Sequence, residues 1–433
     1  MRTAKKYSLK HPDLFKEKLL KWSQQFSNVV WLDSNAENKN DKEKYRSYDA
    51  ILAVDAYTSV LSDYKNAFKT LKEYQSTTHD WIFGYLTYDL KNDIEDLKSA
   101  NFDGLQFPEL FFFQPKKLFL FTGKILEIKY LNSIADELEY DFNAIQKSNG
   151  LIIQESNEPI KIKLRIEKEE YFEKIDTILK HIHRGDIYEV NFCQEFYAEK
   201  VYIHPLQTYF KLNTISKTPF AVFFRCGDNY LLSASPERYL KKEKDKIISQ
   251  PIKGTAKRSE NIKEDLLLKQ NLFLSEKERS ENIMIVDLVR NDLAKTAING
   301  SVKVEELCKI ISYKQVHQMI STVVSTVDDV HPVDILKTTF PMGSMTGAPK
   351  ISAMQIIEVL EETKRGLYSG AVGYFEPNGN FDFNVVIRSI LYNKTKQYVS
   401  YSVGGAITAK SDPLKEYEEC LIKAKAMREV LEN

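Results

Sequence analysis

The chain has 433 residues, its 61 Lys and Arg balance 61 Asp and Glu, and 43% of its residues are hydrophobic. This composition excludes an intrinsically disordered chain, which combines low hydrophobicity with a large net charge, and it lacks the basic excess typical of nucleic-acid-binding proteins. The four cysteines form no CxxC pair, so no zinc knuckle or disulfide framework is expected. No apolar segment is long enough for a signal sequence or a membrane span, so we expect a cytoplasmic protein.

The first third of the chain is rich in strand signals. Residues 109–130 predict consecutive strands interrupted at Pro115 and Gly123. The polar segment 133–165 follows and is the best candidate for a seam in the chain. We therefore expect two regions that fold as one intertwined body, and these are residues 1–150 and 165–433.

In the second region, helices and strands alternate. Helical spacing of apolar residues and capping signals predict helices over 168–183, 275–294 and 351–362 and from Asp412-Pro413 to the C-terminus. Short apolar runs predict strands over 220–224, 230–233, 370–375 and 398–403. Nearly all the candidate chemistry lies in this region.

Two segments carry groups for proton transfer and nucleophilic attack. A strand turns at a Ser-Pro pair directly before Glu237, which places this carboxyl at a fixed exit point. An exposed pair with Arg238 is the alternative. Lys253, in Pro-Ile-Lys-Gly-Thr, is a candidate amine nucleophile whose pKa must fall through burial or through the neighbouring Lys257 and Arg258. A solvated basic loop is the alternative for this segment.

Carboxylates on two predicted helices suit a hard cation such as Mg²⁺, which prefers oxygen ligands. Glu281 opens a run with an apolar stripe, while Glu416, Glu419 and Lys423 form a polar stripe on the terminal helix. Surface charge clusters are the alternative for both helices. The stripe lies away from the predicted apolar face of this helix, which consists of Leu414, Tyr417, Leu421, Ala424 and Leu431.

Two further features predict contacts with an anion. In residues 340–350, glycines and hydroxyls precede a helix that opens at about Pro349, which resembles a backbone anion cradle. The Walker A pattern does not fit this segment. Arg388 lies in an apolar predicted strand, where a bidentate carboxylate is the best partner for its guanidinium.

Together these motifs resemble the chorismate-utilising enzymes, which include anthranilate synthase component I, aminodeoxychorismate synthase component I, isochorismate synthase and salicylate synthase. The motifs are Ser-Pro-Glu, Pro-Ile-Lys-Gly-Thr, Glu-Asn-Ile-Met-Ile-Val-Asp-Leu-Val-Arg-Asn-Asp, Gly-Ser-Met-Thr-Gly-Ala-Pro-Lys, Gly-Ala-Val-Gly-Tyr, Ile-Arg and the final Glu-x-x-Glu. The likeness is continuous over about 165–430 and looser at 30–34 and 84–89. It implies an α+β fold of the anthranilate synthase component I type, with two extensive antiparallel sheets packed as a sandwich and helices outside.

Within this family, Lys253 is the discriminating residue, because anthranilate synthases usually have alanine there and aminodeoxychorismate synthases have lysine. The resemblance therefore implies amination of chorismate to 4-amino-4-deoxychorismate, a folate precursor. Lys253 would attack C2 of the ring while Glu237 protonates the leaving 4-hydroxyl, and ammonia would then enter at C4 and expel the lysine.

The resemblance also implies a metal site and a substrate site. Mg²⁺ would be held by Glu281 and Glu419, with Glu416 in support and Lys423 balancing the charge. The residues implied to contact the substrate are Gln318, Ser344, Thr346, Gly347, Tyr368, Arg388, Gly404, Gly405 and Ala406.

The chain departs from the family pattern at two positions. Gln318 stands where many relatives have an active-site histidine, with His317 displaced by one, and Glu189 stands where glutamine is common. A glutamine cannot act as a cation or shuttle protons near neutral pH.

No cysteine lies in a Gly-x-Cys-x-Gly setting, so ammonia is expected from a separate glutamine amidotransferase subunit. No lyase module is expected either, so the product keeps its enolpyruvyl group. The alternatives are anthranilate synthase component I, a non-catalytic chorismate-binding regulatory protein, and an aldolase-like enzyme that uses Lys253 as a Schiff base.

Overall fold

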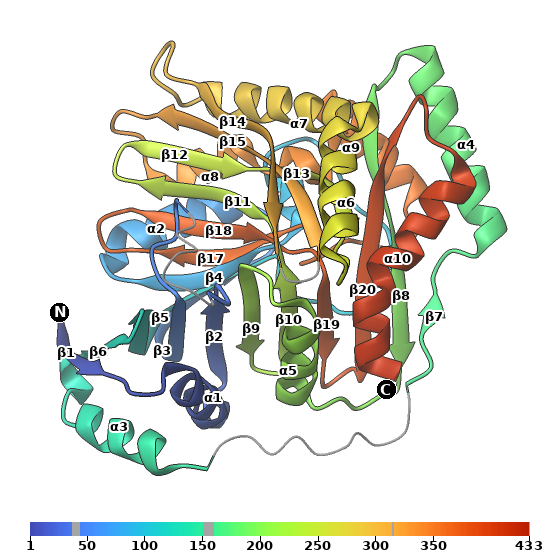
Figure 1. Ribbon diagram of the computed structural model, residues 1–433. Helices are drawn as coiled ribbons and strands as arrows, with labels where there is room; N and C mark the ends of the chain where they lie inside the picture. Colours follow the sequence, from blue (N-terminus) through green and yellow to red (C-terminus); the bar gives the residue numbers. More distant parts are fainter. Residues whose placement is uncertain (37–43, 150–159, 314–315, 433) are drawn as a thin grey trace.

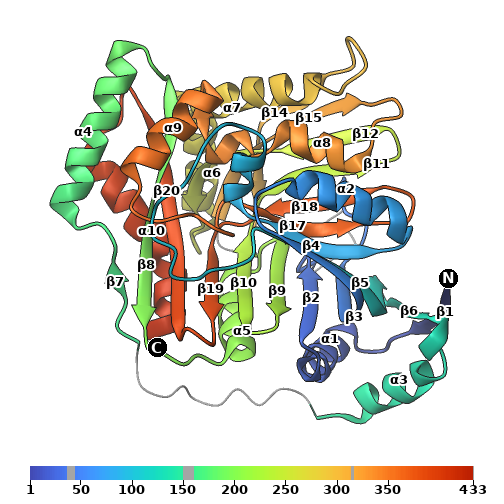
Figure 2. The same ribbon diagram turned by 180° about the vertical axis from the view of Figure 1, so that it is seen from behind.

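A computed structural model describes residues 1–36, 44–149, 160–313 and 316–432 of the chain. Within these residues, hydrogen bonds connect the strands into one 20-stranded sheet, and the pairings between named strands are antiparallel (Figures 1 and 2). The strands are β1 (Arg2–Ser8), β2 (Asn28–Asp33), β3 (Ala50–Ser62), β4 (Ile82–Leu86), β5 (Leu110–Thr122), β6 (Ile125–Leu131), β7 (Lys163–Leu164), β8 (Glu189–Glu199), β9 (Phe220–Cys226), β10 (Asn229–Ser235), β11 (Arg238–Glu243), β12 (Lys246–Gln250), β13 (Ile252–Lys257), β14 (Lys303–Ser312), β15 (Val316–Thr326), β16 (Gly347–Ala348), β17 (Ala371–Phe375), β18 (Phe381–Val385), β19 (Ser389–Asn393) and β20 (Tyr398–Thr408). The helices are α1 (Pro12–Trp22), α2 (Ala67–Thr78), α3 (Glu137–Lys147), α4 (Lys168–Arg184), α5 (Pro205–Ser216), α6 (Ile262–Leu274), α7 (Glu276–Ala294), α8 (Pro332–Thr339), α9 (Lys350–Leu360) and α10 (Pro413–Glu432).

The sheet has two limbs that share β5. The first limb runs in the order β6, β5, β3, β2, β9, β10, β19, β20, β8. The second limb runs in the order β5, β4, β17, β18, β11, β12, β15, and β13 and β14 both pair with β15. Figure 1 shows the first limb upright and the second limb lying across it. The predicted α+β fold with extensive antiparallel structure is confirmed, whereas the sandwich of two sheets stays a prediction.

The long strand β5 corrects one prediction. The sequence predicted an interruption at Pro115, but β5 continues through it and ends before Gly123. Pro115 lies opposite Ala56, beside a register shift between Ala56 and Thr58 in β3. A proline has no N–H to donate to a neighbouring strand, and such an irregularity is where a sheet tolerates it.

Strands from both predicted regions are neighbours in the sheet. The N-terminal β2 pairs with β9, and β4 pairs with β17. The helix α3 occupies part of the predicted seam at 133–165, and residues 150–159 of that seam lie outside the described residues. The boundaries of the two regions stay a prediction.

The four helices predicted in the second region are confirmed, with small shifts of their ends. Helix α4 ends at Gly185, whose φ of 89° is favourable for glycine, and α10 begins after Asp412, whose Oδ1 accepts a hydrogen bond from the Lys415 N–H at 3.0 Å. The predicted apolar face of α10 is partly wrong, because Leu414 and Leu421 are exposed. The helix is rotated so that its buried face includes Glu416, Cys420, Met427 and Val430.

Apolar clusters lie on the outer faces of the limbs and between them. One cluster joins the first limb to α1, α4, α5 and α10, and another joins the second limb to α2, α7 and α8, which Figure 2 shows from behind. A further cluster contains residues from both limbs. Among the described residues, no helix is long and apolar enough to cross a bilayer.

Candidate active site

The chain crosses from one limb to the other at two neighbouring points, and each crossing carries a predicted site residue. Glu237 lies between β10 and β11, and Arg388 lies between β18 and β19. The Val385 N–H donates to the Glu237 carbonyl at 3.0 Å, and the Ala234 N–H donates to the Arg388 carbonyl at 3.1 Å. Arg388 was expected inside a strand, which is wrong: it lies in a bend with a φ of 53°, because the chain changes limbs there.

Glu237 is a buried carboxyl, with only 3% of its surface exposed. Burial raises its pKa to about 7, although a hydrogen bond from Ser344 and the charge of Lys253 oppose this rise. The alternative of an exposed turn is therefore wrong for this residue. A carboxyl with this pKa can carry a proton near neutral pH and donate it to a bound group.

Lys253 lies on β13 and forms an ion pair with Glu189 of β8, with 2.9 Å between Nζ and Oε1. Burial lowers the pKa of Lys253, but the carboxylates of Glu189 and Glu281 outweigh it, so that the pKa is raised overall. The predicted fall of the Lys253 pKa is therefore wrong. Arg258, one of the two cations expected to lower it, is paired with Asp265 at 2.8 Å, and the charged group that pairs with Lys253 is the carboxylate of Glu189. The side chain of Lys253 is 11% exposed, which also excludes the solvated loop.

The second carboxylate oxygen of Glu189, Oε2, is buried and has no hydrogen-bond partner among the described residues. The same is true of the side-chain oxygen Oε1 of Gln318. Glu189 is 1% exposed and Gln318 is 4% exposed. The displaced His317 is engaged elsewhere, since its ring nitrogens contact Ser312 Oγ at 2.8 Å and Asp265 Oδ1 at 3.1 Å. The sequence singled out Glu189 only as a departure from the family pattern and assigned it no role.

The predicted substrate loop is packed against β8. Gly347 pairs with Val190 of β8, and a Cβ atom on Gly347 would lie 2.2 Å from the Glu189 carbonyl oxygen, so only glycine fits there. Thr346 is buried, and its Oγ1 donates to the Gly343 carbonyl at 3.2 Å. The loop that carries Ser344 is thereby held beside both Glu237 and Glu189.

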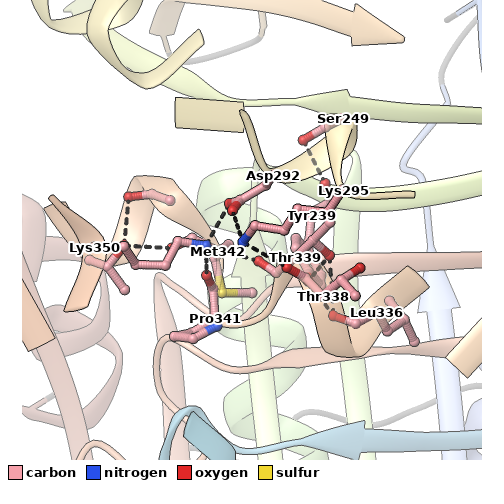
Figure 3. A network of polar contacts seen from close by, with 12 residues as sticks. Tyr239, Ser249, Asp292, Lys295, Leu336, Thr338, Thr339, Pro341, Met342 and Lys350 are labelled. Carbon is pink, nitrogen blue, oxygen red and sulfur yellow. Dashed lines mark hydrogen bonds and ion pairs between the residues drawn. The ribbon is translucent and has the colours of Figure 1, made fainter. Parts of the chain in front are cut away.

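A second buried lysine anchors the two ends of this loop (Figure 3). Lys350 Nζ forms an ion pair with Asp292 and donates to the carbonyls of Thr339 at 3.1 Å and Pro341 at 2.9 Å. Lys295 reaches the other Asp292 oxygen at 3.0 Å. Burial lowers the pKa of Lys350, and Asp292 offsets part of this effect. Sequence reasoning missed this network, because nothing in the local pattern joins Asp292 to Lys350.

Four glutamates gather where α7 meets α10. Burial raises the pKa of Glu281 to about 7 and also raises the pKa values of Glu278 and Glu416, and Glu416 is only 3% exposed. The pKa of Glu419 is lowered despite its burial, because Lys423 lies 2.6 Å away. The alternative of a surface stripe is therefore wrong for Glu416.

Lysines lie between and beside these glutamates. Lys277 Nζ is 3.8 Å from Glu281 and 3.7 Å from Glu416. Lys423 also donates to the Gly404 carbonyl at 2.8 Å, and a Cβ atom on Gly405 would lie 3.2 Å from Glu416 Oε2. The terminal helix and β20 are therefore in close contact at the predicted site.

These glutamates have the donor chemistry for Mg²⁺, although no group of three or more His, Cys, Asp or Glu side chains in the described part of the chain is arranged as a metal site. The Glu281 Oε1 atom is buried and has no hydrogen-bond partner there. Carboxylates crowded enough to raise one another's pKa values would gain from a divalent cation. The residues therefore fit Mg²⁺ chemically, and the metal site stays a proposal.

Arg388 has one other predicted substrate residue, Tyr368, close enough to influence its charge. Burial lowers its pKa against the opposing effects of Tyr368 and Glu419, and no described carboxylate forms an ion pair with it. Tyr368 is 4% exposed, and its hydroxyl contacts Cys193 Sγ at 3.5 Å. At Gly404, Gly405 and Ala406, β20 pairs with β8 on one edge, while its pairing with β19 covers only 398–400. The second edge at 404–406 thus has no strand partner among the described residues.

Comparison with known proteins supports a single family. A family model described as chorismate binding enzyme matches residues 27–429. The aminodeoxychorismate synthase of Streptomyces griseus is 42% identical over 274 residues, which cover 63% of this chain but only 37% of that enzyme. An anthranilate synthase component I-like protein of Synechocystis sp. is 33% identical over 369 residues, covering 85% of this chain and 76% of the relative.

A solved structure confirms the type of fold. The crystal structure of anthranilate synthase component I from Streptococcus pneumoniae superposes with a TM-score of 0.79 and covers 87% of this chain and 91% of that one. Since only 24% of the residues are identical, this likeness concerns the fold alone.

Proposed function

The chain belongs to the family of chorismate-binding enzymes, and from this premise we propose that it is component I of an aminodeoxychorismate synthase. It would aminate chorismate at C4 and form 4-amino-4-deoxychorismate, the precursor of para-aminobenzoate. The observation that carries the proposal is a largely buried lysine, Lys253, whose charge acts on the nearby Glu237, and the pKa of about 7 of Glu237 keeps a proton available.

The two groups divide the chemistry. Lys253 attacks C2 of the ring, the two conjugated double bonds shift, and Glu237 protonates the 4-hydroxyl as it leaves C4. Ammonia then attacks C4 and the lysine leaves C2. Because Glu237 protonates it, the 4-hydroxyl leaves as water and not as hydroxide, which is a poor leaving group.

The surrounding residues bind the two carboxylates of chorismate. Arg388 and Tyr368 take one carboxylate together with the N–H groups of Gly404, Gly405 and Ala406. The remaining predicted contacts come from Gln318, Ser344, Thr346 and Gly347. Arg388 suits this role because it is largely buried and has no carboxylate partner within the described protein.

Mg²⁺ would be held by Glu281 and Glu419 with Glu416 in support, and it would supply positive charge to the ring carboxylate. Lys423 orients Glu419 through their ion pair of 2.6 Å and keeps that carboxylate ionised. Lys277, which lies between Glu281 and Glu416, would have to turn outward toward solvent when the cation is bound.

Ammonia is expected from a glutamine amidotransferase subunit. Similar proteins carry the designation component I in their names, which implies a second component, and this chain has no Gly-x-Cys-x-Gly motif of its own. Free ammonium would replace that subunit in a test.

The test is to incubate the purified protein with chorismate, Mg²⁺ and ammonium and to identify the product. We expect aminodeoxychorismate, which appears as 4-aminobenzoate after an aminodeoxychorismate lyase is added. Anthranilate, seen directly by its fluorescence, would instead support the second candidate, anthranilate synthase component I, to which the Synechocystis relative is similar by name. Chorismate binding without turnover would support a non-catalytic binding protein.

A further inference from the structure

Glu189 is the direct partner of Lys253, although it has no assigned role in the proposed reaction. We propose that Glu189 is the base that accepts a proton from Lys253, so that the amine becomes neutral only when it attacks the substrate. This inference rests on the proposed function, because it concerns the step in which Lys253 bonds to the ring.

The geometry allows direct proton transfer. Glu189 Oε1 lies 2.9 Å from Lys253 Nζ and is its one hydrogen-bond acceptor among the described residues. Glu189 is held in place by its backbone, which pairs with Ala348 of the substrate loop on one side and with Thr408 of β20 on the other. The base is therefore fixed between the two elements proposed to hold the substrate.

The other oxygen of Glu189 points to the same role. Glu189 Oε2 is buried and has no hydrogen-bond partner in the described protein. A structural ion pair in a protein interior normally has its remaining lone pairs satisfied, since an unpaired buried oxygen is costly. This carboxylate therefore retains a free acceptor site beside the lysine.

In the free protein, the surrounding carboxylates hold the proton on Lys253. Besides Glu189, the groups that act on Lys253 through space are Glu281 and Glu237, and Lys253 in turn acts on Glu278 and Glu419. When a substrate fills the pocket and excludes water, an ion pair loses its solvation more than two neutral groups do. Substrate binding thus shifts the pair from ammonium and carboxylate toward amine and carboxylic acid.

The step balances without any further reactant. A proton moves from Lys253 Nζ to Glu189 Oε1, and the freed electron pair of Nζ forms the bond to C2. Both conjugated double bonds of the ring shift, the C4–O bond breaks, and the hydroxyl leaves as water with the proton of Glu237. When ammonia bonds to C4, the double bonds shift back and the C2–N bond breaks. The released amine recovers its proton from Glu189, and the new ammonium group at C4 returns a proton to Glu237.

The test compares the wild type with Glu189→Gln, which keeps the size and a hydrogen bond but removes the base. In the wild type Lys253 passes its proton directly to Glu189, so the lysine need not first lose that proton to solvent. In E189Q the lysine must lose its proton to solvent, so the ascending limb of the kcat/KM profile moves to higher pH. We expect the rate at pH 7 to fall about 100-fold relative to the wild type, and this deficit relative to the wild type to shrink as pH rises.

A structural ion pair predicts the opposite result. If Glu189 only held Lys253 protonated, its removal would move the ascending limb to lower pH and raise the rate at neutral pH. Either that shift or an unchanged profile overturns the proposal. The matched control is Glu195→Gln on the same strand, which removes a buried carboxylate paired with Arg165 at 3.1 Å and should leave the limb in place.

A second readout does not depend on turnover. The pH dependence of Lys253 acylation, followed by peptide mass spectrometry, should shift to lower pH in E189Q, because the carboxylate that stabilises the ammonium is gone. No shift would show that the two groups do not interact in solution and would overturn the proposal. If the wild-type protein forms no aminodeoxychorismate at all, the proposed function fails, and this result is distinct from a failure of E189Q to shift the profile.

Discussion

Two largely buried lysine–carboxylate pairs adjoin the substrate loop, and they differ in how many of their polar atoms have hydrogen-bond partners. Lys350 binds Asp292 and two backbone carbonyls, and Asp292 is shared with Lys295. Lys253 has Glu189 as its one acceptor among the described residues, and Glu189 Oε2 is left without a partner. A fully satisfied pair stabilises a fold, whereas a partly satisfied pair leaves polar groups for a ligand.

The surroundings of the two pairs reinforce the difference. Carboxylates around Lys253 raise its pKa, while burial dominates at Lys350 and lowers its pKa. Lys350 lies among the ends of a loop, and Lys253 lies beside Glu237 where the two limbs meet. We infer that one lysine positions the loop and the other reacts, and four substitutions test this division.

The largest effect is expected for Lys253→Ala. Loss of the nucleophile should lower the rate of aminodeoxychorismate formation at least about 1000-fold, with little change in melting temperature. Lys257→Ala, on the same strand but exposed, is the control and should leave the rate unchanged. If neither the rate nor the product changed in Lys253→Ala, the covalent role of Lys253 would be excluded.

Glu237→Gln should lower kcat by about 100-fold to 10000-fold, since a positioned general acid contributes that much. The sign of the pH dependence follows from the pKa of about 7 that burial gives Glu237. The active form is protonated, so wild-type kcat/KM should fall as pH rises through about 7. The fall of kcat/KM above pH 7 should be absent in E237Q. If it persisted, a group other than Glu237 would be the general acid.

Lys350→Met should mainly destabilise the fold. Without Lys350, the negative charge of the buried Asp292 loses its closest positive partner. We therefore expect the free energy of unfolding, measured by denaturant titration, to fall by about 3 kcal/mol. Lys295→Met removes the more exposed partner of the same carboxylate and should lose less than about 1 kcal/mol. Equal losses in the two variants would contradict the anchoring role of Lys350.

The smallest effect is expected for Arg388→Lys. A lysine keeps the positive charge but cannot hold a carboxylate with two parallel hydrogen bonds, so we expect KM for chorismate to rise about 10-fold with a smaller change in kcat. Steady-state kinetics at saturating Mg²⁺ measures both values. An unchanged KM would show that Arg388 does not contact the substrate.

Much of the fold was predictable because its signals are local. The helices α4, α7 and α10 follow from apolar spacing and from their capping residues, and β9, β17 and β20 follow from short apolar runs. The errors occur where a distant segment decides the outcome. Pro115 is tolerated in β5 because of an irregularity in β3, and Arg388 leaves its strand because the chain changes limbs.

By itself, the sequence determined the identity of the chemical groups and the family to which the chain belongs. Lys253, Glu237, Glu281 and Arg388 could be named because their motifs are contiguous stretches of chain. Only the tertiary structure decided their charge states and neighbours, because the pKa of a buried group depends on residues brought close by folding. Glu189 is 64 residues from Lys253 in the sequence, and their 2.9 Å ion pair exists only because β8 and β13 meet at the site.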